Sequence, residues 1–392
     1  MRRQLLLMLT CLLAFLALVA LINLIANPYA AWPVTAIDKT YLATGPGVER
    51  VATPYRLRTE APDVLLLGTS RVLYGMLIEQ GYRDGVLNAA VSGASLDEVA
   101  AIVDLALRKP RLRRIVWGLD FVTFDDHYRG FREEPTRDRL AGNALRRARE
   151  TLLSLDALQA SGGLLLRAAA GPGRLPAQKL LPVPWPPVAV SAAFAAIGSP
   201  PADAGANALL DQQLREWFGG YAQHRRSDAQ WELFGRTVRR IRDAGIDVTL
   251  LVPPMSMWEL ETIRQAGAWP AFQTWKRELA VFGPYWDFSG YNEVASHDEF
   301  YAFPIFCHFK PVVGHTVLRR VLGADCSACG ALATAVLDSA VWVDETTVDA
   351  HLADEDAALQ RVTQARPRCV ETVQRLVDPS GAVVAAAPSL HD

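Results

Sequence analysis

The stretch Val64-Leu65-Leu66-Leu67-Gly68-Thr69-Ser70-Arg71 is a short apolar run that ends at a small, hydroxyl-bearing turn. Four consecutive aliphatic residues are typical of a parallel strand that is covered on both faces. Gly68 permits a tight turn after the strand, and residues 71–78 continue with a helical pattern. The stretch therefore predicts a buried strand, a turn and a helix, with Ser70 at the N-terminus of the helix.

Ser70 has two interpretations at this position. Serine is a preferred N-cap residue, so the stretch by itself favours a helix cap. The free N–H groups of a helix N-terminus also stabilise developing negative charge, which suits a nucleophile. Residues elsewhere in the chain are needed to distinguish whether Ser70 is a cap or a nucleophile.

Length and composition exclude two classes of protein. The chain has 392 residues, of which 51% are hydrophobic, so it can bury a large core and is not a disordered protein. The formal net charge is −2, and the basic residues are spread along the chain. This charge pattern gives no reason to expect a nucleic-acid partner.

The N-terminus predicts a membrane anchor. Arg2 and Arg3 precede an apolar run over residues 5–25, which is long enough to cross a bilayer as a helix. A cleaved signal peptide has a shorter apolar core, so we expect an uncleaved anchor, although residues 26–31 include small residues that a peptidase accepts. The two arginines should stay in the cytoplasm. We therefore expect a single-pass protein of the cytoplasmic membrane, with its globular part on the periplasmic side.

The cysteines do not predict a metal site. Cys326 and Cys329 form one pair without the second pair of ligands that structural zinc requires. In an oxidising compartment, a disulfide among Cys326, Cys329 and Cys369 is plausible, with a connectivity that the sequence leaves open. We expect neither a metal nor a cofactor.

A repeated strand–helix pattern follows the anchor. Residues 86–91 and 114–121 read as two further strands, and Ser95 and Glu98 are spaced as a capping box for the helix between them. Consecutive crossover units imply a parallel α/β sheet with helices on both faces. The polar ends of the three strands, at Ser70, Gly93 and Asp120, should meet at the carboxyl edge, where open parallel sheets bind ligands.

The remaining segments set the expected boundaries. We predict an anchor over residues 1–30, an extended linker interrupted by prolines over 31–60, and one α/β domain over 61–325. An Ala/Gly/Pro-rich tract over about 154–206 reads as an insertion, either a lid or disordered. Residues 326–392 should hold one helix, over about 346–363, and a poorly ordered tail.

Ser70, Gly93 and His308 together suit acyl transfer. His308 follows the last predicted core strand and precedes a helix for which Pro311 is a suitable first residue. A serine hydroxyl needs a base to take its proton, and the tetrahedral oxyanion needs preorganised N–H donors. His308 is the candidate base, and the backbone N–H groups of Ser70 and Gly93 are the candidate donors. This set favours the nucleophile over the cap.

These blocks resemble those of the SGNH (GDSL-like) hydrolases, especially membrane-anchored envelope members related to polysaccharide O-acetyltransferases. The resemblance covers residues 63–322 without the insertion and rests on four blocks: Gly68-Thr69-Ser70, Asn88 to Gly93, Trp117 to Asp120, and His308-Phe309-Lys310-Pro311. It implies a three-layer, flavodoxin-like parallel-sheet fold and a serine esterase or O-acyltransferase. The implied partners are a carbohydrate polymer or oligosaccharide and an integral-membrane acyl carrier.

Two positions depart from the pattern of this family. Asp120 stands where the family has an asparagine that donates to the oxyanion, and an ionised carboxylate has no proton to donate. Ile305 stands where the family has the acid that orients the histidine. The candidate substitutes for that acid are Asp298, Glu299, Asp287 and Asp120.

The two departures also support a second interpretation. In it, the fold has lost its activity and binds a glycan or supports an envelope assembly. Other candidate residues have simpler explanations: Asp125-Asp126-His127 as a solvated loop, Cys307 as a sequence neighbour whose side chain does not face His308, and His315 as a surface or helix-packing residue.

Overall fold

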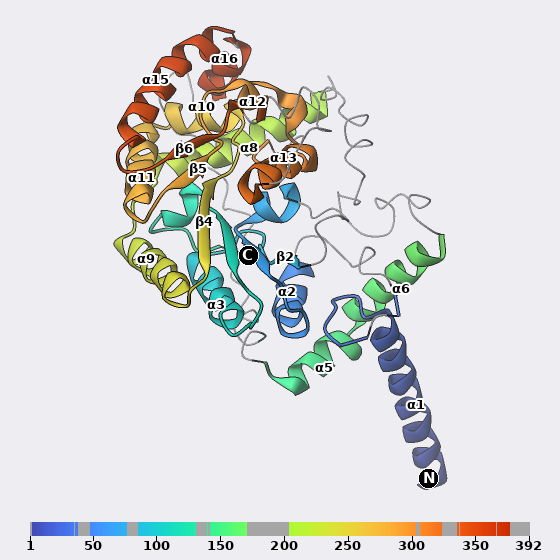
Figure 1. Ribbon diagram of the computed structural model, residues 1–392. Coiled ribbons are helices and arrows are strands. Elements are labelled where there is room, and N and C mark those ends of the chain that lie inside the picture. The colour runs from blue at the N-terminus through green and yellow to red at the C-terminus, as the bar shows by residue number, and fades with distance from the viewer. Residues whose placement is uncertain are drawn as a thin grey trace. The chain divides into compact units, whose positions relative to one another are not determined.

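The computed structural model describes residues 2–34, 36–37, 48–76, 85–130, 139, 142–170, 204–302, 306–323, 335–336, 338–365 and 367–376. The chain divides into two compact units (Figure 1). The first comprises residues 1–61, 104–110 and 133–187, and the second comprises residues 62–103, 111–132 and 188–392.

The second unit holds a mixed α/β structure around a mostly parallel sheet. The strands described lie in the order β2-β1-β3-β4-β5-β6. All neighbours pair in parallel except β6, which is antiparallel to β5. The bounds are β1 Val64–Leu67, β2 Val86–Asn88, β3 Arg114–Gly118, β4 Asp247–Val252, β5 Tyr285–Asp287 and β6 Val341–Val343.

Helices connect and flank these strands (Figure 1). The described helices that accompany the sheet are η2 Arg71–Gly75, α3 Leu96–Ala106, η4 Phe121–Phe124, α8 Ala204–Ala222, α9 Asp228–Asp243, α10 Met257–Gln265, α11 Trp269–Val281, α12 Glu293–Ser296, η6 Asp298–Phe300, α13 Pro311–Leu322, α15 Val348–Ala365 and α16 Pro367–Leu376. The expected capping box of α3 is confirmed: the Ser95 N–H donates to Glu98 Oε2, and the Glu98 N–H donates to Ser95 Oγ.

Gly68 allows β1 and β3 to approach closely where they end. Its φ of +150° is a conformation that favours glycine. A Cβ at this position would lie 2.9 Å from the carbonyl oxygen of Gly118 on β3 and 2.5 Å from Val72. The glycine is therefore required both by the turn and by the neighbouring strand.

Two glycines bring α13 against η2. A Cβ on Gly314 would lie 2.0 Å from the carbonyl oxygen of Gly75, and a Cβ on Gly75 would lie 2.2 Å from the ring of Phe309. Phe309 and Val72 belong to the same buried core cluster. Because only glycine leaves room for this contact, the segment that carries Ser70 and the segment that carries His308 are packed backbone to backbone.

The first unit is helical. It contains α1 Arg2–Ala26, α2 Val48–Thr59, α5 Ala144–Leu152 and α6 Leu155–Ala170. α1 is long and apolar enough to cross a membrane. Near its C-terminal end it packs against α5 and α6. The Asn23 side chain donates to the Leu152 carbonyl at 2.9 Å and accepts from Ser161 Oγ at 2.7 Å.

The prediction of an extended segment over residues 31–60 was wrong for its second half. Residues 48–59 form α2, with Pro54 inside the helix. Pro54 has no N–H for the carbonyl of Arg50, which would otherwise be left without that bond. The Arg139 side chain donates to this carbonyl instead, at 3.4 Å. A long-range contact that the local sequence does not show thus compensates for the proline.

Three other expectations also need correction. Residues 155–170 of the predicted insertion form α6 in the first unit, and residues 204–206 begin α8. Residues 367–376 of the predicted tail form α16, which buries Cys369 and Val373. Residues 341–343 add an edge strand. Cys326 and Cys329 lie outside the described residues, so the proposed disulfide stays a prediction.

Candidate functional site

Ser70 and His308 meet at the carboxyl edge of the sheet. Ser70 follows β1, and the ring nitrogen Nε2 of His308 lies 2.8 Å from Ser70 Oγ. The strand order reverses between β1 and β3, since β2 lies on one side of β1 and the later strands lie beyond β3. Crevices at such a reversal are where open α/β sheets bind their ligands.

The Ser70 side chain does not cap the helix that follows it. No cap hydrogen bond forms from this side chain, although Ser70 is the N-cap residue of η2. The turn itself is a single π-helical turn, a distortion that is frequent at functional sites. Asn88 holds the turn because its amide donates to the carbonyls of Val72 at 3.0 Å and Met76 at 3.1 Å.

The backbone around His308 is held by a neighbouring segment. The Ala302 N–H donates to the His308 carbonyl at 2.8 Å, and the Lys310 N–H donates to the Phe300 carbonyl at 2.7 Å. Pro311 occupies the first turn of α13, as predicted. The Tyr74 ring packs edge-on against the imidazole, with ring centroids 5.6 Å apart. These contacts orient the imidazole toward the serine.

The backbone N–H groups of Ser70 and Gly93 are available as donors. Within the described part of the chain, neither N–H donates to an acceptor. The β1–β2 ladder continues past the strands, since the Val91 N–H donates to the Gly68 carbonyl at 3.1 Å. This bond places the Gly93 turn, with φ of +56°, alongside the Ser70 turn. The arrangement suits an oxyanion hole.

The environment of His308 favours its neutral form. Burial and then the positive charge of Arg71 lower the pKa of His308 to about 4. A neutral imidazole can accept the Ser70 proton at neutral pH. No carboxylate of the described residues hydrogen-bonds to the ring. Ser70 and His308 are therefore a dyad in the described structure.

Asp120 does not face the serine as an oxyanion donor. One of its carboxylate oxygens accepts from Arg71 Nε at 2.7 Å, and the other accepts from Thr69 Oγ1. Burial raises the pKa of Asp120, while Arg71 and Thr69 oppose that rise. Asp120 thus anchors the turn that presents Ser70.

Arg71 joins three elements behind the serine. Besides Asp120 after β3, it pairs with Glu259 on α10. Glu259 also accepts from the Tyr221 hydroxyl at 2.6 Å. A cavity of about 10 Å³ borders Arg71, Asp120 and Glu259. This volume holds about one water molecule and is too small for a substrate. The buried network fixes the position of the Ser70 turn.

Two further candidate acids, Asp298 and Asp287, are engaged elsewhere. Asp298 accepts from Trp258 Nε1 at 2.9 Å. Asp287, at the end of β5, accepts from His351 Nε2 at 2.9 Å and pairs with Lys276 at 2.8 Å. Neither forms the hydrogen bond to His308 that an orienting acid makes. Ile305 lies outside the described residues.

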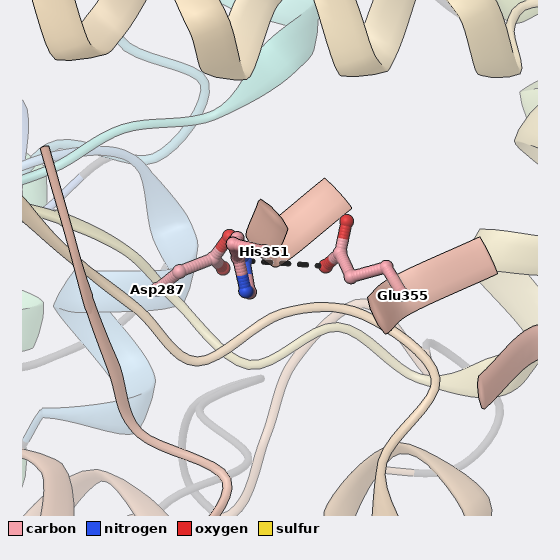
Figure 2. A group of neighbouring side chains, drawn as sticks. All are labelled: Asp287, His351 and Glu355. Atoms are coloured by element: carbon pink, nitrogen blue, oxygen red, sulfur yellow. Dashed lines mark hydrogen bonds and ion pairs between the residues drawn. The ribbon is translucent and has the colours of Figure 1, made fainter. Parts of the chain in front are cut away.

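Asp287, His351 and Glu355 converge as metal ligands do (Figure 2). The buried ammonium group of Lys276 lies among the same atoms and pairs with both carboxylates. Burial alone would lower the pKa of Lys276, but Asp287 and Glu355 raise it above its ordinary value. The cluster is therefore an ion-pair network centred on a lysine, which joins α11, β5 and α15.

The residues with simpler explanations have structural contacts. Asp125 accepts from the Arg225 N–H at 3.2 Å and lies 3.0 Å from His224 Nδ1, so it holds a loop and is not merely solvated. Burial raises the pKa of Cys307 to about 12, which keeps it a thiol. His315 is buried in α13.

Comparison with protein-family models, with curated proteins and with solved structures finds no match for this chain.

Sequence reasoning missed the residues that support the site. Arg71, Glu259, Gly75 and Gly314 were not candidates, because their roles depend on partners far along the chain. The sequence can indicate that an arginine is buried only when the acidic residues that pair with it are already known. One sequence feature could have indicated the contact between Gly75 and Gly314: Gly75 interrupts a stretch that otherwise reads as a helix.

Proposed function

We propose that the chain is a membrane-anchored serine esterase or O-acyltransferase with an SGNH-like, three-layer fold. The observation that supports this proposal best is the 2.8 Å contact between Ser70 Oγ and His308 Nε2 at the carboxyl edge of the sheet. In the proposed reaction His308 takes the Ser70 proton, Ser70 Oγ attacks an ester carbonyl, and the alcohol leaves with that proton. Water or a second alcohol then accepts the acyl group.

The proposed substrates are acetyl esters of an envelope or extracellular polysaccharide, and the proposed location is the periplasmic side of the membrane. Both follow from the resemblance to envelope SGNH hydrolases and from α1, which is long and apolar enough to span a bilayer. An acyl donor from the cytoplasm would require an integral-membrane carrier as a partner.

Covalent labelling tests the proposal without knowledge of the substrate. The full-length protein in detergent is incubated with a fluorophosphonate probe, which reacts with activated serines, and the adduct is located by mass spectrometry. We expect a single adduct on Ser70 that Ser70→Ala and His308→Ala abolish. The matched control is Ser296→Ala, since Ser296 lies on α12 and its side chain, among the described residues, bonds to its own helix and to His297. A folded wild-type protein that stays unlabelled contradicts the proposal.

One observation favours a second candidate function. His308 lacks an orienting acid among the described residues, and Asp120 is paired with Arg71 and does not donate to the site. These features suit a non-catalytic protein that binds a glycan or supports an envelope assembly. This alternative predicts glycan binding that Ser70→Ala leaves unchanged, together with no labelling of Ser70.

A further inference from the structure

Helix α6 has an inverted distribution of side chains. Its buried face consists mostly of small residues, at Ala157, Ala160 and Ser161, joined by Leu164. Its outer face carries large apolar residues, with Leu155 82% exposed and Leu166 51% exposed. Soluble proteins place large apolar residues toward the core, whereas helices in lipid pack through small residues and direct large ones outward.

The outer face of α6 is largely apolar, and the exposed Asp156 borders it. Leu155, Gly162 and Leu166 are seven and four residues apart, so they lie on one side of the helix. A Cβ added at Gly162 would have no atom of the described residues within 4 Å, so this side is open in the part of the chain that the structure describes. Gln159 is the polar residue between them. Leu165 adds a further exposed leucine next to this face.

The position of α6 along α1 gives the depth of this face. The apolar run of residues 5–25 measures about 30 Å as a helix, which matches the thickness of the hydrocarbon core. Asn23, two residues before the end of that run, accepts from Ser161 in the middle of α6. The middle of α6 is therefore level with the boundary of the bilayer when α1 spans it.

We propose that the Leu155–Leu166 face of α6 lies in the interfacial region of the lipid bilayer, beside the end of α1. α6 then acts as a second apolar contact with the membrane. The inference rests on the membrane anchor of the proposed function and is independent of the proposed chemistry. A second copy of this chain or a partner protein on the same face is the alternative that the experiment separates.

Site-specific photocrosslinking tests this inference in the full-length protein. A diazirine amino acid replaces Leu166, Leu13 or Val281 in separate variants, which are reconstituted in phosphatidylcholine–phosphatidylglycerol vesicles that contain an alkyne-tagged lipid. Leu13 lies on α1 and is 65% exposed. Val281, on α11, is 66% exposed and serves as the matched apolar control in the other unit. Limited proteolysis confirms that each variant is folded.

We expect the Leu166 variant to give several-fold more lipid adduct than the Val281 variant and a yield close to that of Leu13. A yield equal to that of Val281 overturns the inference, and so does a Leu166 probe that crosslinks to protein in place of lipid. Absence of lipid adducts at Leu13 overturns both the anchor and the inference. Serine labelling of the same preparations reports separately on the proposed chemistry.

Discussion

At the scale of single residues, the pKa of His308 determines when the dyad can work. Burial and the charge of Arg71 lower that pKa to about 4. The proposed base is therefore neutral over a wider pH range than an ordinary histidine, whose pKa is about 6.5. Protonation below the lowered pKa removes the acceptor for the Ser70 proton.

The pH dependence of ester hydrolysis tests this assignment. We expect kcat/KM for an activated acetyl ester to stay constant from neutral pH down to roughly pH 5 and to fall with a midpoint near 4. The measurement is a pH–rate profile at constant ionic strength, with the hydrolysis by buffer alone subtracted. A midpoint at 6.5 would show that His308 is solvated and is not held beside Arg71.

A second residue-scale prediction concerns the missing acid. An acid that orients the catalytic histidine is worth about 10⁴ in turnover in a known triad. Neither Asp287 nor Asp298 hydrogen-bonds to His308. Under the proposed SGNH-like function, Ile305 stands at the sequence position where the orienting acid is expected. We expect Ile305→Asp to raise turnover of a small ester by a measurable fraction of that factor.

The control for this substitution is Ile305→Asn, which is polar and of similar size but cannot stabilise an imidazolium by charge. Steady-state kinetics of both variants provide the comparison. Equal activity of wild type, Ile305→Asp and Ile305→Asn would count against Ile305 as the vacant acid position.

At the scale of elements, the approach of α13 to η2 brings together His308 and Ser70, the proposed base and nucleophile. A methyl group at Gly314 would lie 2.0 Å from the backbone oxygen of Gly75, which cannot rotate away. We expect Gly314→Ala to separate the two elements, to lower stability by about 1–3 kcal/mol, and to slow labelling of Ser70. Thermal unfolding and labelling rates measure both effects.

Gly219→Ala is the matched control. Gly219 lies within α8, and a Cβ there would have no atom within 4 Å. Alanine is favoured over glycine in a helix by about 0.5–1 kcal/mol, so this variant should be neutral or slightly stabilised. If Gly314→Ala behaves like Gly219→Ala, the close packing of α13 on η2 is not needed for the site.

The buried ion-pair network of Lys276, Asp287, His351 and Glu355 joins α15 to the sheet. Its contribution to the stability of the folded protein depends on pH. Burial alone would lower the pKa of His351, but its hydrogen bond to Asp287 and the charges of Asp287 and Glu355 raise it. Because the folded-state pKa lies above the unfolded value, the stabilisation is fully present below pH about 6.5 and is lost as pH rises through the folded pKa.

Two substitutions test the network. Removal of one partner from a buried ion pair costs about 3–5 kcal/mol, so we expect Lys276→Met to destabilise the protein strongly. For His351→Gln, we expect the deficit in unfolding free energy to be largest at low pH and to shrink as pH rises. Denaturant unfolding at several pH values measures both, and a deficit that grows with pH would reverse the assigned sign.

At the scale of the whole molecule, the chain separates a helical unit that contains α1 from the α/β unit that contains Ser70. Asn23 is buried at 0% exposure and forms two hydrogen bonds to the α5 and α6 segments. A membrane-spanning helix does not itself need a polar side chain near its end. The two hydrogen bonds to α5 and α6 explain why α1 has an asparagine there.

We expect Asn23→Leu to leave membrane insertion intact and to weaken the packing of α6 on α1, by about 0.5–1.5 kcal/mol for each hydrogen bond lost. Faster proteolysis within residues 144–170 would report the weakened packing. Labelling of Ser70 should not change, since Ser70 lies in the other unit. Unchanged proteolysis would show that the two hydrogen bonds do not hold α6.

Local sequence determined the repeating elements of this protein. The apolar run of α1, the strand before Gly68, the capping box at Ser95 and Pro311 at the start of α13 are all short-range signals, and each element forms where it was predicted. The parallel sheet follows from their alternation. These features depend on neighbours within a few residues, so the sequence alone is sufficient for them.

The tertiary structure decided what no local pattern contains. It formed α2 around Pro54, where the Arg139 side chain donates to the Arg50 carbonyl. It paired Asp120 with Arg71, and it directed Asp287 to Lys276 and His351. It also placed His308 against Ser70, 238 residues earlier, through the contact of two glycines. Each outcome depends on a partner distant in sequence, and only the folded chain brings such partners together.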